Sequence, residues 1–164
     1  MSSDFYINFI RPHAGIIIKI CRAYSDSQED FEDLYQEVCL QIWRTRDNFL
    51  KNSEWSTWVY RISLNVCMTI KKKEAKRATQ STSLDSVPEV LSNDSSAFQE
   101  ESLTLLYNAI KQLSDVDRAI ILLYLEEKTY KEIAELIGTN YNNIGVRIQR
   151  IKHKLKKLIV KHHE

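Results

Sequence analysis

Residues 129–151 read TYKEIAELIGTNYNNIGVRIQRI and carry the strongest local signals in the chain. Thr129 and Glu132 form a T-x-x-E capping box, in which the two side chains satisfy free backbone N–H groups at the start of a helix. Gly138 follows the apolar residues of this short helix and supplies the left-handed residue that ends it. Asn140 is suited to cap the helix that follows. The stretch therefore predicts a helix, a tight turn and a second helix.

The second of these helices carries an apolar stripe beside a basic one. The apolar stripe, spaced at four and three residues, consists of Ile144, Ile148, Ile151, Leu155 and Leu158. The basic stripe lies about a quarter turn away and consists of Arg147, Arg150, Lys154, Lys157 and Lys161. A helix-turn-helix places such a helix in the major groove of DNA, whereas a basic stripe alone is more often a solvated helix face. The stripe, the capping box and the glycine turn together predict DNA binding.

The composition extends the helical prediction to the whole chain. Among 164 residues, 3 are Gly and 2 are Pro, which disfavours turn-rich all-β folds and Gly-rich phosphate loops. The longest apolar runs are far shorter than the roughly 20 residues that span a bilayer, and the first residues lack a signal-peptide pattern. We therefore expect a cytoplasmic protein without direct membrane insertion.

Residues 79–102 are rich in Ser, Thr, Asp and Glu and contain neither Lys nor Arg. Such a composition is typical of a flexible acidic linker. Residues 1–78 and 103–164 on either side carry apolar stripes at helical spacing. The predicted fold class is all-α, with two small helical domains joined by this linker.

Charge is segregated along the chain, although the formal net charge is +1. Residues 26–37 are acidic, whereas residues 61–77 and 147–164 are predominantly basic. This distribution suits a protein that presents one face to a polyanion and another to a basic protein surface. For the acidic segment, a solvated helix face is an equally good interpretation of the composition.

An aromatic segment precedes the first basic cluster. Trp55, Trp58 and Tyr60 are followed by Lys71, Lys72 and Lys73. Aromatic rings stack on unpaired bases while cations follow the backbone, so the combination suits single-stranded nucleic acid. Trp58 lies on an apolar stripe, which favours a core position for that residue; Trp55 lies off the stripe.

Enzymatic readings find little support in the sequence. The four histidines and the three cysteines show no metal-ligand spacing, and no Ser or Cys sits in a nucleophile motif. We expect no catalytic activity, no metal and no cofactor. The cysteines Cys21, Cys39 and Cys67 are expected to be buried free thiols.

Four motifs in this order resemble the extracytoplasmic-function group of bacterial sigma factors, a branch of the sigma-70 family. They read DFEDLYQEVCLQIWR at residues 30–44, WSTWVYRISLN at 55–65, LSDVDRAIILLY at 113–124 and TYKEIAELIG at 129–138. The resemblance covers nearly the whole chain. It implies a region 2 helical bundle in residues 1–78 and a region 4 helix-turn-helix in residues 103–164, separated by the linker.

The resemblance also implies roles for individual residues. Docking on core RNA polymerase would fall to Asp30, Asp33, Leu34, Gln36 and Glu37. Opening and holding the minus-10 element would fall to Trp55, Arg61, Asn65, Lys71, Lys72 and Lys73. Phosphates beside the minus-35 element would be contacted by Thr129, Tyr130 and Lys131. The recognition helix for this element would include Asn142, Asn143, Arg147, Gln149 and Arg150.

Two positions of the recognition helix depart from the family pattern. Gly145 and Val146 stand where many members carry a basic and a small polar residue, so a common base contact is missing. Gly145 also costs the helix up to about 1 kcal/mol relative to Ala. Asn and Gln can read adenine bidentately, and we therefore hypothesise that specificity rests on Asn142, Asn143, Gln149 and Arg150.

The leading interpretation is a sigma factor that binds core RNA polymerase and directs promoter-specific initiation. The resemblance implies an anti-sigma factor as a further partner, which in this group is often anchored in the membrane. The alternative is a stand-alone helix-turn-helix regulator, which would bind duplex DNA tightly without polymerase. A protein-interaction adaptor is a third class, and it would show little salt-dependent DNA binding.

Overall fold

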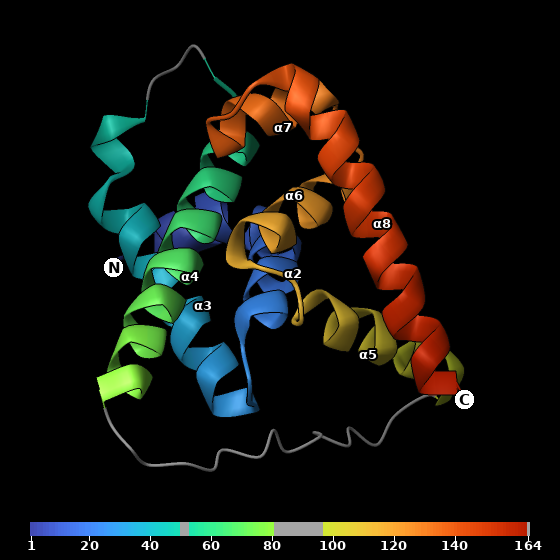
Figure 1. The fold of residues 1–164 in the computed structure, drawn as a ribbon. Coiled ribbons are helices and arrows are strands. Elements are labelled where there is room, and N and C mark those ends of the chain that lie inside the picture. Colours follow the sequence, from blue (N-terminus) through green and yellow to red (C-terminus); the bar gives the residue numbers. More distant parts are fainter. Residues whose placement is uncertain (50–52, 81–96, 164) are drawn as a thin grey trace. The chain divides into compact units, whose positions relative to one another are not determined.

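The computed structural model describes residues 1–49, 53–80 and 97–163, and helices are the regular secondary structure of these ranges. The described residues form two compact units. Unit 1 contains the described residues up to Gln80, and unit 2 contains those from Ala97 onward (Figure 1). The all-α fold class with two small helical domains is confirmed.

Unit 1 is a bundle of three long helices preceded by a short helical segment. The helices are α2 (Ala14–Tyr24), α3 (Gln28–Arg44) and α4 (Trp55–Gln80), and each of them packs on the other two. The preceding segment runs through α1 (Ser3–Phe5), a π-helical turn (Tyr6–Ile10) and a 3-10 turn (Arg11–His13). The core between the helices includes the fully buried Ile17, Ile20, Leu34, Val38 and Val59. The apolar stripes predicted the long helices but not the first segment.

All three cysteines lie in the interior of unit 1. They are free thiols and buried, as expected from the sequence. The Sγ atoms of Cys21 and Cys67 are 4.0 Å apart, joining α2 to α4. Burial raises the pKa of the Cys39 thiol to about 11, so this thiol is protonated at neutral pH.

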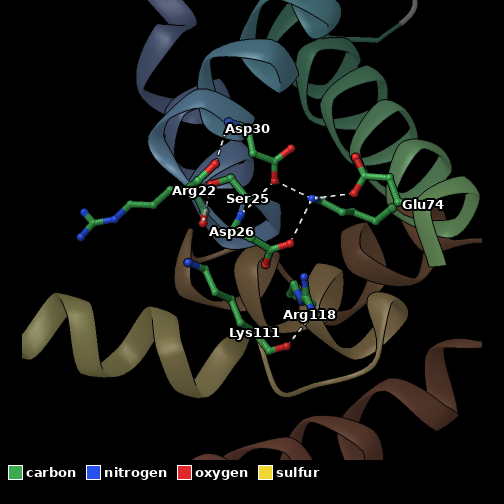
Figure 2. Close-up of polar contacts among 9 residues, drawn as sticks. Arg22, Ser25, Asp26, Asp30, Glu74, Lys111 and Arg118 are labelled. Carbon is green, nitrogen blue, oxygen red and sulfur yellow. Dashed lines mark hydrogen bonds and ion pairs between the residues drawn. The ribbon is translucent and has the colours of Figure 1, made fainter. Parts of the chain in front are cut away.

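Unit 2 consists of α5 (Ala97–Ile110), α6 (Asp115–Leu125), α7 (Tyr130–Ile137) and α8 (Tyr141–His163). The long helix α8 packs on each of the other three (Figure 1). The core is formed by side chains that are almost completely buried: Ile110, Ile120, Leu123, Ile133, Ile144 and Ile148. The turn between α5 and α6 is closed by Arg118, whose Nη2 donates to the carbonyls of Lys111 (2.7 Å; Figure 2) and Leu113 (3.2 Å).

Local caps define the helix ends of unit 2. The Thr129 hydroxyl accepts the Glu132 N–H (3.1 Å), and the Glu132 carboxylate accepts the Thr129 N–H (3.3 Å), so the capping box is confirmed. Gly138 ends α7 in the left-handed conformation, with φ of 82°. The Asn140 side chain accepts the Asn142 N–H at the start of α8 (3.0 Å). The predicted helix, turn and helix are thus present.

The segment predicted as a linker, residues 79–102, is partly helical. Its last six residues belong to α5, which begins at Ala97, and α4 extends to Gln80. Gln99, Glu100 and Glu101 are good helix formers and directly precede the apolar stripe that begins at Leu103, so the helix extends N-terminally through them. Residues 81–96 lie outside the described residues.

Among the described residues, no helix combines the length and the apolar character that a membrane crossing requires.

Candidate nucleic-acid interface

The acidic part of α3 begins at a capped helix end. The Ser27 hydroxyl accepts the Asp30 N–H (3.0 Å), which satisfies a free donor of the first turn. Asp33 and Gln36 are exposed, and Glu37 is half-buried and lies 3.5 Å from Arg44. Leu34 is buried in the core, so its side chain supports this face from beneath and is not part of the surface.

Lys71 joins the start of α3 to α4 through a cluster of carboxylates. Its Nζ lies 2.5 Å from Asp30, 3.0 Å from Glu74 and 3.4 Å from Asp26. Asp30 also accepts the backbone N–H of Asp26 (2.9 Å). Figure 2 shows Asp26, Asp30 and Glu74 converging on this point. The Lys71 side chain is only 12% exposed.

The electrostatics of this cluster favour the charged lysine. Burial alone would lower the pKa of Lys71, but hydrogen bonds to Asp30 and Glu74 and the negative charge of Asp26 outweigh burial. The pKa of Lys71 is therefore raised above its ordinary value of 10.5. Asp30 and Lys71 were assigned by resemblance to two different surfaces, yet they bind each other and join those surfaces.

The other predicted residues of α4, apart from Trp55, lie on the helix surface. Arg61, Asn65, Lys72 and Lys73 are all exposed. Arg61, Asn65 and Lys72 are spaced at four and seven residues, which places their side chains along one side of α4. Of the three predicted lysines, Lys71 is the one that turns inward. The exposed members form a basic and amide-bearing strip that can follow a nucleic-acid backbone.

Trp55 belongs to an aromatic cluster at the start of α4. Its Nε1 donates to the backbone carbonyl of Phe9 (2.7 Å). The rings of Phe5, Phe9 and Phe49 surround it, with centroids 6.3, 5.8 and 5.0 Å away. The indole N–H and much of the ring of Trp55 are therefore engaged inside unit 1.

The aromatic cluster continues on either side of Trp55. Trp43 contacts Phe5 at 5.0 Å and Trp58 contacts Phe49 at 6.0 Å, so all three tryptophans take part. Trp58 is half-buried, whereas Phe9 is 48% exposed. Phe9 belongs to none of the motifs described above, and its one signal in the sequence is the spacing of four residues between Phe5 and Phe9.

The start of α7 presents the residues predicted to touch phosphates. Lys131 is exposed, and the Thr129 hydroxyl is used in the capping box. Tyr130 packs toward α8, because a Cβ built at Gly145 would lie 3.4 Å from its ring carbon Cε2. The glycine that departs from the family pattern therefore lies where the Tyr130 ring approaches the recognition helix.

The outer side of α8 carries most of the predicted base-contacting residues. Asn142, Asn143, Gln149 and Arg150 are exposed. Arg147 is less accessible, because its Nε donates to Asp117 of α6 at 2.7 Å. Val146, one of the two positions that depart from the family pattern, is 56% exposed among these polar residues.

The described residues contain no group of three or more His, Cys, Asp or Glu side chains that could hold a metal ion. The exposed side chains of these surfaces supply cations for phosphates, amides for base edges and carboxylates for a basic protein.

Family models match both units in the order expected. Sigma-70 region 2 matches residues 9–77, and Sigma-70, region 4, matches residues 103–155. Among curated relatives, the ECF RNA polymerase sigma factor SigW of Bacillus subtilis is 25% identical over 165 residues, covering 94% of this chain and 88% of SigW. SigE of Mycolicibacterium smegmatis, also an ECF RNA polymerase sigma factor, is 25% identical over 157 residues, or 93% of this chain.

The chain is shorter than some of these relatives. It spans 61% of the length of SigE and 46% of the length of the Mycobacterium tuberculosis sigma factor SigG, to which it is 27% identical over 171 residues and 88% of this chain.

Solved structures share the fold. The sigma factor RpoE of Bartonella quintana, crystallised with the anti-sigma factor NepR, superposes with a TM-score of 0.76 at 20% identity, covering 96% of this chain and 98% of RpoE. CnrH, solved with the cytosolic domain of CnrY, gives a TM-score of 0.67 at 16% identity, covering 98% of this chain and 90% of CnrH.

Proposed function

The chain belongs to the sigma-70 family, in its extracytoplasmic-function group, and from this premise we propose that it binds core RNA polymerase and directs promoter-specific transcription initiation. One observation carries the proposal: a region 2 unit and a region 4 unit occur in order, and each has an exposed basic and amide-bearing helix face. The chain acts as a binding subunit in the cytoplasm and performs no chemistry itself. The stand-alone regulator is not favoured, because it requires no region 2.

Unit 1 serves polymerase and the melted strand. Asp33, Gln36 and Glu37 of α3 face outward with negative or polar groups, which complements a basic docking surface. On α4, Arg61 and Lys72 follow the backbone of the minus-10 strand. Asp30 and Lys71 act indirectly, since their ion pair holds the two helices in a fixed relation.

Unit 2 binds the minus-35 element as duplex. Lys131 at the start of α7 contacts phosphates, and the exposed amides of Asn142, Asn143 and Gln149 read base edges in the major groove. Arg147 positions α8 against α6 through Asp117, and its remaining guanidinium donors face the phosphates. An anti-sigma factor is a further partner under this proposal, by analogy with the RpoE–NepR complex.

Run-off transcription tests the proposal. A genomic fragment library is transcribed with purified chain, with core RNA polymerase from a related bacterium, and with both. Transcripts that start at defined sites only when both are present support a sigma factor. Duplex DNA bound tightly by the chain alone, without any binding to core, would instead establish a regulator.

Matched variants locate the two surfaces. Asp33→Asn should weaken binding to core, whereas Glu32→Gln, which removes another exposed negative charge from the same helix, should leave it unchanged. The double variant Asn142→Ala with Asn143→Ala should change which promoters are used while core binding stays intact. Unchanged promoter preference would contradict the proposed role of these amides.

A further inference from the structure

Val146 lies on the outward face of α8, near the start of the helix. At about 100° per residue, it points about 170° away from the mean direction of the buried Ile144, Ile148 and Ile151. Asn142 and Gln149 flank it along the same face, one turn before and one turn after. If α8 lies in the major groove with its buried face directed away from the DNA, Val146 points toward the base edges.

The residues on either side of Val146 fix its direction. Gly145 is approached by the Tyr130 ring, with a built Cβ only 3.4 Å from Cε2. Arg147 is held by its 2.7 Å bond to Asp117. Because Arg147 is bonded to α6 and the buried Ile144 and Ile148 lie in the core of unit 2, α8 is held in one rotation about its axis. Val146 is therefore presented in one orientation.

The chemistry of this position selects a particular group on DNA. Val146 is 56% exposed and apolar, and the neighbouring side chains on the face are amides and a cation. In the major groove, thymine is the base that offers a methyl group to an apolar side chain, while adenine offers the pattern that Asn and Gln match. An A·T base pair would therefore satisfy Val146 and an adjacent amide together.

We infer that Val146 contacts the 5-methyl group of a thymine in the minus-35 element and is a specificity-determining residue of this chain. The inference rests on the proposed function and deepens it, because it names the chemical group that replaces the contact missing at this position. A preference for thymine at one position of the upstream element follows.

A second valine on the same helix provides the matched control. Val160 is 50% exposed, almost as much as Val146. It lies fourteen residues further along α8, about 21 Å at 1.5 Å per residue. A single exposed apolar residue is common on protein surfaces, so Val160 measures what such a residue contributes without a thymine to contact.

The test removes one methyl group from DNA and two from the protein. A promoter obtained by core-dependent run-off transcription is synthesised with each thymine of its upstream element replaced in turn by deoxyuracil. Binding of the complete holoenzyme is measured for the wild-type chain, Val146→Ala and Val160→Ala. We expect one thymine at which loss of the methyl weakens wild-type binding about fourfold, the value for one buried methylene-sized group.

The variants separate the possible outcomes. With Val146→Ala the effect of the methyl at that thymine should disappear, and with Val160→Ala it should persist. Equal methyl effects in wild type and Val146→Ala, or no methyl-sensitive thymine, would overturn this inference while the transcripts still support a sigma factor. Absence of any core-dependent transcript would overturn the proposed function and this inference with it.

Discussion

The lysines of unit 1 and the polar residues of unit 2 show how differently similar side chains can be used. Lys71 lies among three carboxylates with 12% of its side chain exposed, whereas Asn142 and Arg150 of α8 face outward. Two of the three carboxylates around Lys71, those of Asp26 and Asp30, come from residues 45 and 41 positions away in sequence. In unit 2, the caps join residues two or three positions apart. Contacts with residues distant in the sequence therefore determine whether a polar side chain is exposed on the surface or buried in the folded structure.

The largest effect is expected when the inward-facing lysine of this comparison, Lys71, is replaced. Lys71→Met leaves Asp26, Asp30 and Glu74 close together without their cation, and should lower the free energy of unfolding of unit 1 by about 2 kcal/mol, since the cluster is only partly buried. Urea unfolding followed by tryptophan fluorescence measures it, because Trp43, Trp55 and Trp58 all lie in unit 1. Lys72→Met, on the exposed face, should change stability by no more than about 0.5 kcal/mol. Equal losses in the two variants would show that Lys71 is not a structural cation.

The pH dependence of the same pair of variants follows from the raised pKa of Lys71. A raised folded-state pKa means that the stabilisation is fully present below the unfolded value of 10.5 and is lost as pH rises through the folded value. The stability difference between wild type and Lys71→Met should therefore stay constant from roughly pH 6 to 9. A difference that shrinks within this range would contradict the cluster geometry.

The second prediction concerns Gly138, at the turn between α7 and α8 of unit 2. Gly138→Ala places a β-carbon on a residue with φ of 82° and should cost about 1 kcal/mol, although nothing lies within 4 Å of the added atom. Gly138→Asn should cost less, because Asn tolerates the left-handed conformation. Amide hydrogen exchange in α7 and α8 measures both. No loss in Gly138→Ala would mean that the turn does not depend on the glycine.

The third prediction concerns a glycine to alanine substitution within α8, at Gly145, where we expect stability to increase. Gly145→Ala should stabilise α8 by about 0.5–1 kcal/mol, because Gly is a poor helix former and the new β-carbon meets Tyr130 at an ordinary contact distance of 3.4 Å. Amide exchange in α8 should slow. A destabilised variant would instead indicate that the Tyr130 ring cannot yield and that the close approach requires glycine.

The smallest expected effect concerns the capping box. The pKa of Glu132 lies below its ordinary value of 4.5. The largest cause is the hydrogen bond from the Thr129 N–H, and the Thr129 hydroxyl and the charge of Lys128 also contribute. Its charged form therefore stabilises unit 2 above pH 4.5, and this contribution is lost as pH falls through the lowered value. Glu132→Gln keeps the cap but not the charge, so its small stability deficit should vanish in acid. Thermal unfolding followed by circular dichroism tests this, and a deficit independent of pH would contradict it.

The sequence predicted most of unit 2 because its signals are local. The capping box, the left-handed Gly138 and the Asn140 cap are all encoded within a few residues, and each is present. Glu127, between α6 and α7, is an exception to this local encoding. Its φ of 62° lies in the left-handed region, but the position holds no glycine that would indicate this conformation in the sequence.

The sequence predicted the helices of unit 1 better than the use of their polar and aromatic residues. The apolar stripes indicated α2, α3 and α4, but neither the inward turn of Lys71 nor the Phe9–Trp55 hydrogen bond has a local signature. Leu34 was grouped with acidic neighbours by motif, although its apolar side chain and helical spacing are those of a core residue. The proposed roles of the exposed residues on α3, α4 and α8 remain predictions for the experiments above.

The separation between contact partners in unit 1 also sets an order of events during synthesis. Asp30 emerges from the ribosome 41 residues before Lys71, and Phe9 emerges 46 residues before Trp55. Until α4 has emerged, the first two long helices expose apolar faces that only α4 can cover. The nascent chain therefore passes through a stage in which it is open to chaperones and to aggregation. The helix caps of unit 2 can form as soon as each helix start leaves the ribosome, whereas the apolar face of α5 is covered only once α8, which packs on it, has emerged.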